Sequence, residues 1–190
     1  MQETYHRDKT FDKVNYAGKA LSGREFESCT FTNCDFSESN LSGNDFVDCR
    51  FDGCNLSMMR VDQTGLKNVE FHNCKMMGVD FSACNEFLLA VSFHNCILDF
   101  VSFFRRKLRK TAFSGCSIKE ANFTQTDLTG AAFVECDLSQ TVFQQTILEK
   151  ADFRSARNFS IDPELNKIKK AKFSTSGLIG LLDKYDLVVE

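Results

Sequence analysis

The sequence has no tryptophan, only one proline, three tyrosines and three histidines, and no long uninterrupted run of apolar residues. Because such a run is missing, among the first eight residues as elsewhere, no signal peptide or membrane span is predicted. A formal net charge of −3 supplies no basic surface for nucleic-acid phosphates. Direct binding to nucleic acid is therefore not expected.

An apolar residue at every fifth position dominates what is present. The series runs from Phe11 to Phe81, resumes two residues late at Leu88, and continues to Phe153. A period of five fits neither a helix nor a flat strand, so it indicates a solenoid. Phenylalanine and cysteine also recur every twenty residues, which makes four pentapeptides one square coil. Successive coils are expected to stack like strands, about 4.8 Å apart.

Small residues usually stand two positions before each apolar centre. All nine cysteines fall on this position or on its extrapolation across the break, as Cys34 and Cys54 illustrate. We interpret them as small buried hydrophobic residues that pack between the large ones. Their odd number and the missing secretory signal argue against a disulfide framework. A reducing, cytoplasmic location is predicted.

Signatures of catalysis and metal binding are scarce. No glycine-rich phosphate loop, nucleophile elbow or C-x-x-C zinc motif occurs. His72 and His94 are predicted to be outward neighbours on adjacent coils, but no third ligand accompanies them, so a solvated pair is favoured over a metal site. A filled rod has no substrate cavity. We therefore predict a non-enzymatic protein with no cofactor and no metal.

The repeating pattern is A-(D/N)-(L/F)-X-X, which is clearest in Ala-Asn-Phe-Thr-Gln at 121–125 and Ala-Asp-Phe-Arg-Ser at 151–155. It resembles the pentapeptide-repeat family, whose fold is a right-handed quadrilateral β-helix. The resemblance covers about residues 9–158. It implies an all-β solenoid of this kind, and the residues that follow it are expected to add a short C-terminal α-helical cap.

The chain is expected to divide into an N-terminal cap at 1–10, a repeat region at 11–158 with a break at 82–89, and a C-terminal segment at 159–190. In that segment Asp162 is a suitable N-cap and Pro163 a suitable first helical residue, which predicts a helix over 163–171. A second short helix is predicted after Ser176, and residues 186–190 have a strand pattern.

The apolar C-terminal side chains either cover the last coil or form a symmetric dimer contact, and both can hold together. The candidates for dimerisation are Leu178, Ile179, Leu182, Tyr185, Leu187 and Val189.

Residues 160–168 and 177–189 resemble the C-terminal region of the gyrase-interacting members of the family, the quinolone-resistance Qnr and microcin-immunity proteins. This resemblance implies a cytoplasmic, rod-shaped dimer joined through its C-termini. It also implies mimicry of B-form DNA, binding to DNA gyrase or topoisomerase IV, and protection of these enzymes from quinolones or toxins.

The charge pattern favours DNA mimicry only weakly, since no side of the coil is uniformly acidic. The side centred on Phe26 begins acidic and turns basic at Lys107. The side centred on Phe36 mixes acidic residues with Lys75 and Lys119. A generic protein-interaction scaffold with another partner and no topoisomerase role therefore stays open.

Apolar residues that the lattice turns outward indicate a protein-binding surface beside the break. We predict that residues 85–110 contact the partner, although the basic run 105–110 also fits an ordinary polar face. The candidate contacts are Met58, Met77, Asn85, Glu86, Phe87, Phe100, Phe104 and Arg105, with the acidic residues Asp35, Glu38 and Asp99.

Overall fold

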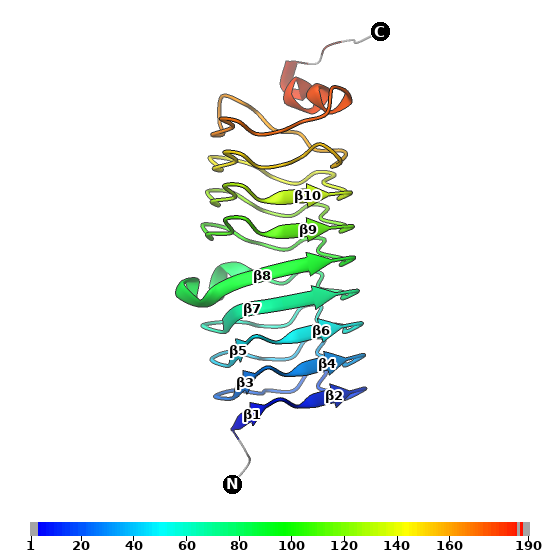
Figure 1. Ribbon diagram of the computed structural model, residues 1–190, viewed down its shortest axis with the longest axis vertical. Coiled ribbons are helices and arrows are strands. Elements are labelled where there is room, and N and C mark those ends of the chain that lie inside the picture. Colours follow the sequence, from blue (N-terminus) through cyan, green and yellow to red (C-terminus); the bar gives the residue numbers. More distant parts are fainter. Residues whose placement is uncertain (1–3, 186, 188–190) are drawn as a thin grey trace.

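Short parallel strands, stacked coil upon coil, build a rod with the N-terminus at one end and the C-terminus at the other (Figure 1). The computed structural model describes residues 4–185 and 187. The fold is the right-handed quadrilateral β-helix predicted from the sequence. The strands are β1 (Tyr5–Arg7), β2 (Thr10–Asp12), β3 (Glu25–Glu27), β4 (Thr30–Thr32), β5 (Asp45–Val47), β6 (Arg50–Asp52), β7 (Gly65–His72), β8 (Leu89–His94), β9 (Ala112–Ser114) and β10 (Ala132–Val134). The 3-10 helices are η1 (Phe81–Ala83), η2 (Glu86–Leu88), η3 (Ser176–Leu181) and η4 (Asp183–Tyr185).

The twenty-residue period is the register of the stack. Phe31 pairs with Phe51, and Phe51 with Phe71, while the next step, from Phe71 to Phe93, spans 22 residues and keeps the register. The rings of Phe93 and Phe113 stack with centroids 5.3 Å apart, and both are fully buried. Apolar centres therefore form four columns along the axis, which we name after Phe26, Phe31, Phe36 and Leu41. Offset stacking within a column adds to the burial of the rings.

Each coil turns its corner at the residue two positions after an apolar centre. Ser28, Asn33, Glu38 and Asp48 all have left-handed backbone conformations, with φ between 52° and 56°. That conformation is unfavourable for residues other than glycine. Backbone bonds between coils offset the penalty, as when the Glu38 amide donates to the Ser57 carbonyl at 2.9 Å.

Asn and Asp residues before the centres have a structural role at these corners. The Asn122 side-chain oxygen accepts from the Thr124 amide at 2.9 Å, and Asp35 accepts from the amide and hydroxyl of Ser37. Such local turns fix the chain where it leaves each short strand. This explains the preference for D/N in the repeat.

The small inward residues satisfy carbonyl groups of the preceding coil. The Cys34 thiol donates to the Phe11 carbonyl at 3.3 Å, and the Thr126 hydroxyl donates to the Phe103 carbonyl at 2.7 Å. All nine cysteines are buried and unbridged, as predicted. Cysteine and threonine thus fill the same position because each is small and carries one donor.

The N-terminal end differs from the predicted cap. Residues 5–10 belong to the first coil, since β1 pairs with β3 in the same register as later strands. His6 is buried in the Phe26 column and stacks on Phe26 with ring centroids 4.9 Å apart. An imidazole therefore serves as the first apolar centre, which the five-residue series from Phe11 did not include.

The helix predicted over 163–171 is wrong. This segment adds another coil, because the Lys167 and Lys172 amides donate to the carbonyls of Thr146 and Ala151. Buried Asn166 completes the coil, accepting from the Thr146 amide and donating to the Phe143 carbonyl, both at 2.9 Å. The open ladder of the preceding coil outweighs the helix-start signals at residues 162–163. The ladder therefore continues past residue 158, and the cap that follows is built of 3-10 turns, η3 and η4.

Candidate partner-binding surface

The break in the lattice combines an insertion with a deletion. Leu89, and not Leu88, lies in register with Leu66, so the chain from Phe81 to this centre is three residues longer than usual. From Leu89 to Phe93 it is one residue shorter, and the two changes give the net shift of two. The predicted position of the centre was wrong because adjacent leucines fit the series equally well.

The additional residues form the insertion loop (residues 82–88), which contains most of η1 and all of η2. Two short turns hold it: the Asp80 carboxylate accepts from the Ser82 amide at 2.9 Å, and the Asn85 side chain accepts from the Phe87 amide at 3.1 Å. Arg106 on the next coil donates to the Cys84 carbonyl at 3.4 Å. The loop is therefore fixed at both ends and to the coil beside it.

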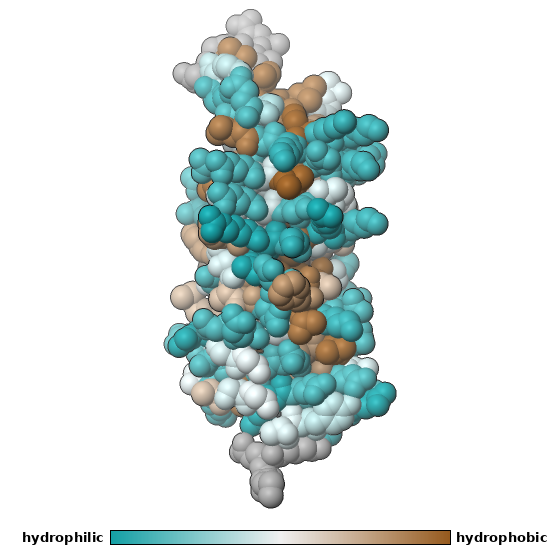
Figure 2. Space-filling view, turned by 90° about the vertical axis from the view of Figure 1, so that its left-hand side faces the viewer, coloured by the Kyte–Doolittle hydropathy of each residue, from teal (hydrophilic) through white to brown (hydrophobic). Residues whose placement is uncertain are grey.

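Phe87 lies at the outside of this loop with 87% of its surface exposed, more than any other large hydrophobic residue described. The exposed Glu86 and half-buried Asn85 flank it. Figure 2, which faces the side of the rod carrying the loop, shows hydrophobic side chains gathered about halfway along the molecule. A hollow of about 380 Å³ lies beneath the loop, lined in part by Phe87 and Arg106.

The other predicted contacts lie on neighbouring parts of the rod without forming one cluster. Phe104 is half-buried, and the Arg105 guanidinium lies over its ring at 4.7 Å from the centroid. No ring contact joins Phe87, Phe100 and Phe104 in the described part of the chain. Their predicted grouping is therefore looser than a shared aromatic core.

Met58 and Phe100 form a separate apolar corner. Both have positive φ, and both are at least half exposed. They occupy equivalent corners two coils apart, with Gly78 between them and the half-buried Met77 next to it. The Met58 sulfur lies across Gly78, in the space that a side chain there would take. The outward direction expected for Met58 and Phe100 is thus confirmed.

The acidic candidates Asp35 and Asp99 are engaged in local structure. Hydrogen bonds from Ser37 lower the pKa of Asp35. Asp99 accepts from the Ser117 hydroxyl at 2.7 Å and the Lys119 amide at 2.9 Å. Glu38 is exposed at a corner. Asp35 and Asp99 are therefore bound in local structure, and the three carboxylates do not line up as an uninterrupted acidic stripe.

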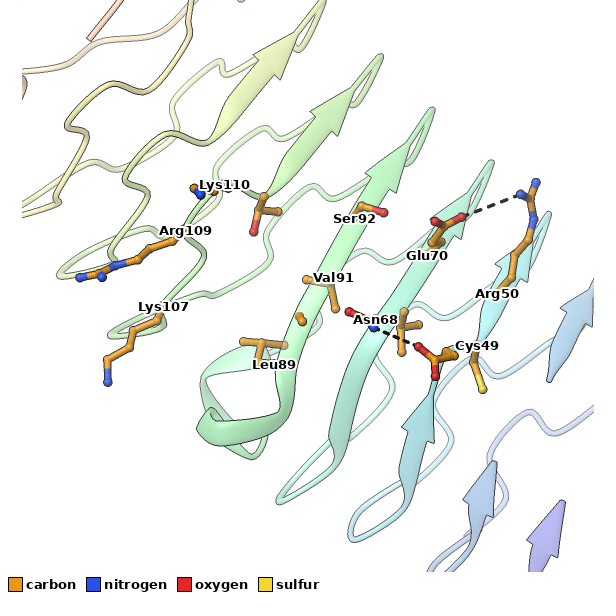
Figure 3. A pocket seen from close by; sticks show the side chains of 14 residues that line it. Cys49, Arg50, Asn68, Glu70, Leu89, Val91, Ser92, Lys107, Arg109 and Lys110 are labelled. Atoms are coloured by element: carbon orange, nitrogen blue, oxygen red, sulfur yellow. Dashed lines mark hydrogen bonds and ion pairs between the residues drawn. The ribbon is translucent and has the colours of Figure 1, made fainter. Parts of the chain in front are cut away.

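A groove lies at the corner between the Phe26 and Phe31 columns, which we call the corner groove. Its volume is about 630 Å³. In Figure 3, Leu89 and Val91 come from β8, Glu70 comes from β7, and Lys107 comes from the following coil. The five-residue series did not predict this groove, because a centre at Leu88 keeps the spacing of five to Phe93 and hides the missing corner residue.

The corner groove presents no ionised thiol among the described residues that line it. Its one thiol belongs to Cys49, and burial raises the pKa of that thiol to about 12, so it stays protonated. Beside the groove, partial burial opposes ionisation of Asp127, but hydrogen bonds from Thr129 and Arg109 outweigh it and lower the pKa of this carboxyl. Arg109 donates to Asp127 at 2.6 Å.

Comparison with family models identifies the repeat. The model described as "Pentapeptide repeat region" matches residues 24–103, and the model "Pentapeptide repeats (8 copies)" matches residues 96–133 and 131–160. Together they cover residues 24–160, well over half of the chain. The chain belongs to the pentapeptide-repeat family.

Two solved structures of the pentapeptide-repeat protein QnrB1 share this fold. Full-length QnrB1, described as a plasmid-mediated fluoroquinolone resistance protein, is 18% identical, with 96% of this chain and 100% of that chain covered and a TM-score of 0.56. A trypsin-treated QnrB1 variant is 21% identical over 95% and 99% of the two chains, with a TM-score of 0.52. HetL from the cyanobacterium Nostoc, described as involved in heterocyst differentiation regulation, is 16% identical over 90% and 87%, with a TM-score of 0.41. No curated protein matched the chain.

The described part of this pentapeptide-repeat protein shows neither a cluster of metal ligands nor a membrane-spanning helix. His72 and His94 are stacked neighbours, with ring centroids 4.6 Å apart, but no group of three or more potential ligands occurs in the described residues. Within the same part of the chain, no helix is long and apolar enough to cross a membrane.

The C-terminal cap of the pentapeptide-repeat rod exposes apolar side chains. η3 packs on Phe159, and Gly177 and Gly180 allow the close approach. Lys184 ties the cap to the preceding coil through Asp162 at 2.9 Å and Glu164 at 2.8 Å. The exposed members of the predicted dimer surface are Leu178, Ile179, Leu182, Tyr185 and Leu187, and Val189 lies outside the described residues.

Proposed function

We propose that this protein is a non-enzymatic rod that binds DNA gyrase or topoisomerase IV in the cytoplasm and protects it from quinolones or toxins. The observation that carries the proposal is the insertion loop, which presents Phe87 almost fully exposed on an otherwise regular rod. The end-to-end likeness to QnrB1, a fluoroquinolone resistance protein, supports this choice of partner.

A large apolar side chain held outside the surface is typical of a protein-binding site. Burying the Phe87 ring against a partner would remove its apolar surface from water, and aromatic anchors often dominate such interfaces. The turns at Asp80 and Asn85 hold the loop in place before binding. The contact is thus expected to be made by a loop and not by the flat faces alone.

As part of this proposal, DNA mimicry is assigned to the N-terminal half of the rod. Residues 1–95 contain 14 acidic and nine basic residues, whereas residues 96–190 contain 12 acidic and 14 basic residues. A phosphate-like field requires an excess of negative charge. The acidic excess therefore lies on the N-terminal side of the insertion loop.

The test is DNA supercoiling by gyrase with increasing amounts of this protein, with and without a fluoroquinolone. We expect rescue from the drug at low protein concentration, or inhibition of supercoiling at high concentration. No effect in either arm, with a protein shown to be folded, would contradict the topoisomerase role. Bovine serum albumin at equal concentration controls for non-specific effects.

The alternative function is a protein-interaction scaffold with a different partner. The basic side chains after residue 104 favour it, because they differ from the surface of a DNA mimic. Capture of partners on the immobilised rod, compared with the Phe87→Asp variant, would separate the two functions.

We further propose that two copies associate through the C-terminal cap into a longer rod. Leu178 and Ile179 are 46% and 57% exposed, and a two-fold contact would cover them. Leu178→Asp with Ile179→Asp is expected to convert a dimer into a monomer in sedimentation velocity. The matched control is Val134→Asp with Val142→Asp, which changes two exposed residues away from the cap and should leave the dimer intact. A monomeric parent protein would contradict the proposal.

A further inference from the structure

The corner groove exists because one corner residue is missing. Neighbouring coils turn this corner with a residue of positive φ. These residues are Asp8, Ser28, Asp48, Asn68, Lys110, Gly130, Lys150 and Lys170. In the coil of β8, Lys67 pairs with Ala90 and Val69 with Val91, so no residue stands opposite Asn68. The chain therefore passes from Ala90 to Val91 without the corner residue that the coils before and after it have. Those neighbouring coils extend further outward at this corner.

The missing corner residue leaves one side of β8 unpaired over part of its length. β8 pairs with β7 at six positions, beginning at Leu66 with Leu89. On its other side it pairs with β9 only through Phe93 and His94. The first four residues of β8, 89–92, thus form a strand edge that faces the corner groove. Unpaired strand edges readily accept another extended chain.

Two backbone amides identify where the ladder is interrupted. In later coils the centre of this column donates to the next coil, as Leu108 does to Asp127 and Leu128 to Ile147, both at 2.8 Å. The residue before the centre donates backwards, as Asp127 does to Arg106 at 2.9 Å. The corresponding bonds from the Leu89 and Lys107 amides across the step between the coil of β8 and the next coil are not formed. The ladder is therefore interrupted at the corner groove.

The charge of the groove determines which extended chain would fit. On the wall formed by the coils of β6 and β7, Asp48 accepts from Asn68 at 3.0 Å. Glu70 lies close to His72 and to Arg50, and Figure 3 marks its ion pair with Arg50. The acidic groups on that wall are therefore neutralised or hydrogen-bonded.

The opposite wall carries unpaired positive charge. Lys107 and Lys110 are exposed, and neither has an ionic partner in the described part of the chain. Arg109 between them is held by Asp127. Negative charge on a bound segment would interact favourably with the two lysines.

We propose that the corner groove binds an extended acidic segment of a protein partner, which pairs its backbone with the edge of β8 and places carboxylates beside Lys107 and Lys110. The groove volume lies within the range of natural ligand sites, roughly 300–1,000 Å³. The inference rests on the proposed protein-binding role but not on the identity of the partner. A nucleic-acid strand would satisfy the lysines but could not continue a β-ladder.

The test is fluorescence anisotropy with a labelled eight-residue peptide of alternating glutamate and valine, and it uses no topoisomerase. We expect saturable binding to the wild-type protein, weakened at least about tenfold by Lys107→Glu with Lys110→Glu. The matched control is Lys75→Glu with Lys170→Glu, since Lys75 precedes an apolar centre as Lys107 does, and Lys170 has the same corner φ as Lys110 within 1°. It should change the affinity less than about twofold.

A second arm tests backbone pairing with the wild-type protein only, so it does not depend on the folding of a variant. A peptide of the same sequence with alternate amides N-methylated keeps its charge but loses main-chain donors. We expect its binding to weaken at least about tenfold. Equal binding of the two peptides would overturn the pairing, as would tighter binding of an eight-nucleotide single strand. Absent peptide binding, or equal effects of both double variants, would overturn the site.

Discussion

Replacing Phe87 with aspartate is expected to abolish the effect of this protein on DNA gyrase while leaving the rod folded. The ring is 87% exposed, so its removal takes little from the core. At a partner interface, truncation of an aromatic anchor commonly weakens binding by 2 kcal/mol or more, and a buried carboxylate adds a desolvation penalty. We expect at least about a thirtyfold loss of potency in the supercoiling assay.

The control for this prediction is Val142→Asp, which places the same charge at an exposed apolar position distant in sequence from the loop. Adding Phe104→Asp tests the second aromatic contact, although Phe104 is half-buried and its change also affects packing. Phe87→Asp alone is therefore the variant that tests whether the insertion loop contacts gyrase. Wild-type potency of Phe87→Asp, measured on protein of unchanged circular dichroism, would exclude the insertion loop as the contact.

Phe93→Ala is expected to lower the free energy of unfolding by about 3–5 kcal/mol. Phe93 is fully buried, stacks between Phe71 and Phe113, and meets Phe81 and Phe103 edge to face. The substitution removes all of these contacts and leaves a cavity in a column that cannot collapse without shifting its coils.

Urea denaturation followed by circular dichroism measures this change, with Phe100→Ala as the control. Phe100 occupies a corner and is 50% exposed, so its truncation should lower the stability by less than about 1 kcal/mol. Because coils contact only their neighbours, the Phe93 variant is also expected to unfold less cooperatively than the parent. An equal decrease in the free energy of unfolding in Phe93→Ala and Phe100→Ala would show that the stacked columns are not the main source of stability.

The five-residue lattice made most of the fold predictable because each apolar centre repeats the same environment. Where the pattern was broken, the residue types alone did not determine the register of the chain. A shift of two residues at the break was clear, but an insertion of three with a deletion of one was not, since both Leu88 and Leu89 suit a centre. At residues 163–171, local helix signals opposed an open ladder that only the assembled coil reveals.

Of the two candidate surfaces, the insertion loop could be predicted from the sequence and the corner groove could not. An apolar residue in an irregular segment indicated Phe87, and the structure places it on the surface. The corner groove depends on which backbone groups lose their partners, and that follows from register and not from side-chain type. Its cationic residues were visible in the sequence, but without the register they were indistinguishable from a solvated face.

The insertion loop leads directly into one of the two longest strands of the rod. β7 and β8 pair at six positions, whereas the other strand pairs join two or three. Conformational entropy lost on association is smallest when the binding element is already ordered. Anchoring Phe87 beside this extended pairing therefore favours binding with little rearrangement of the free protein, so association is expected to be fast and limited mainly by orientation.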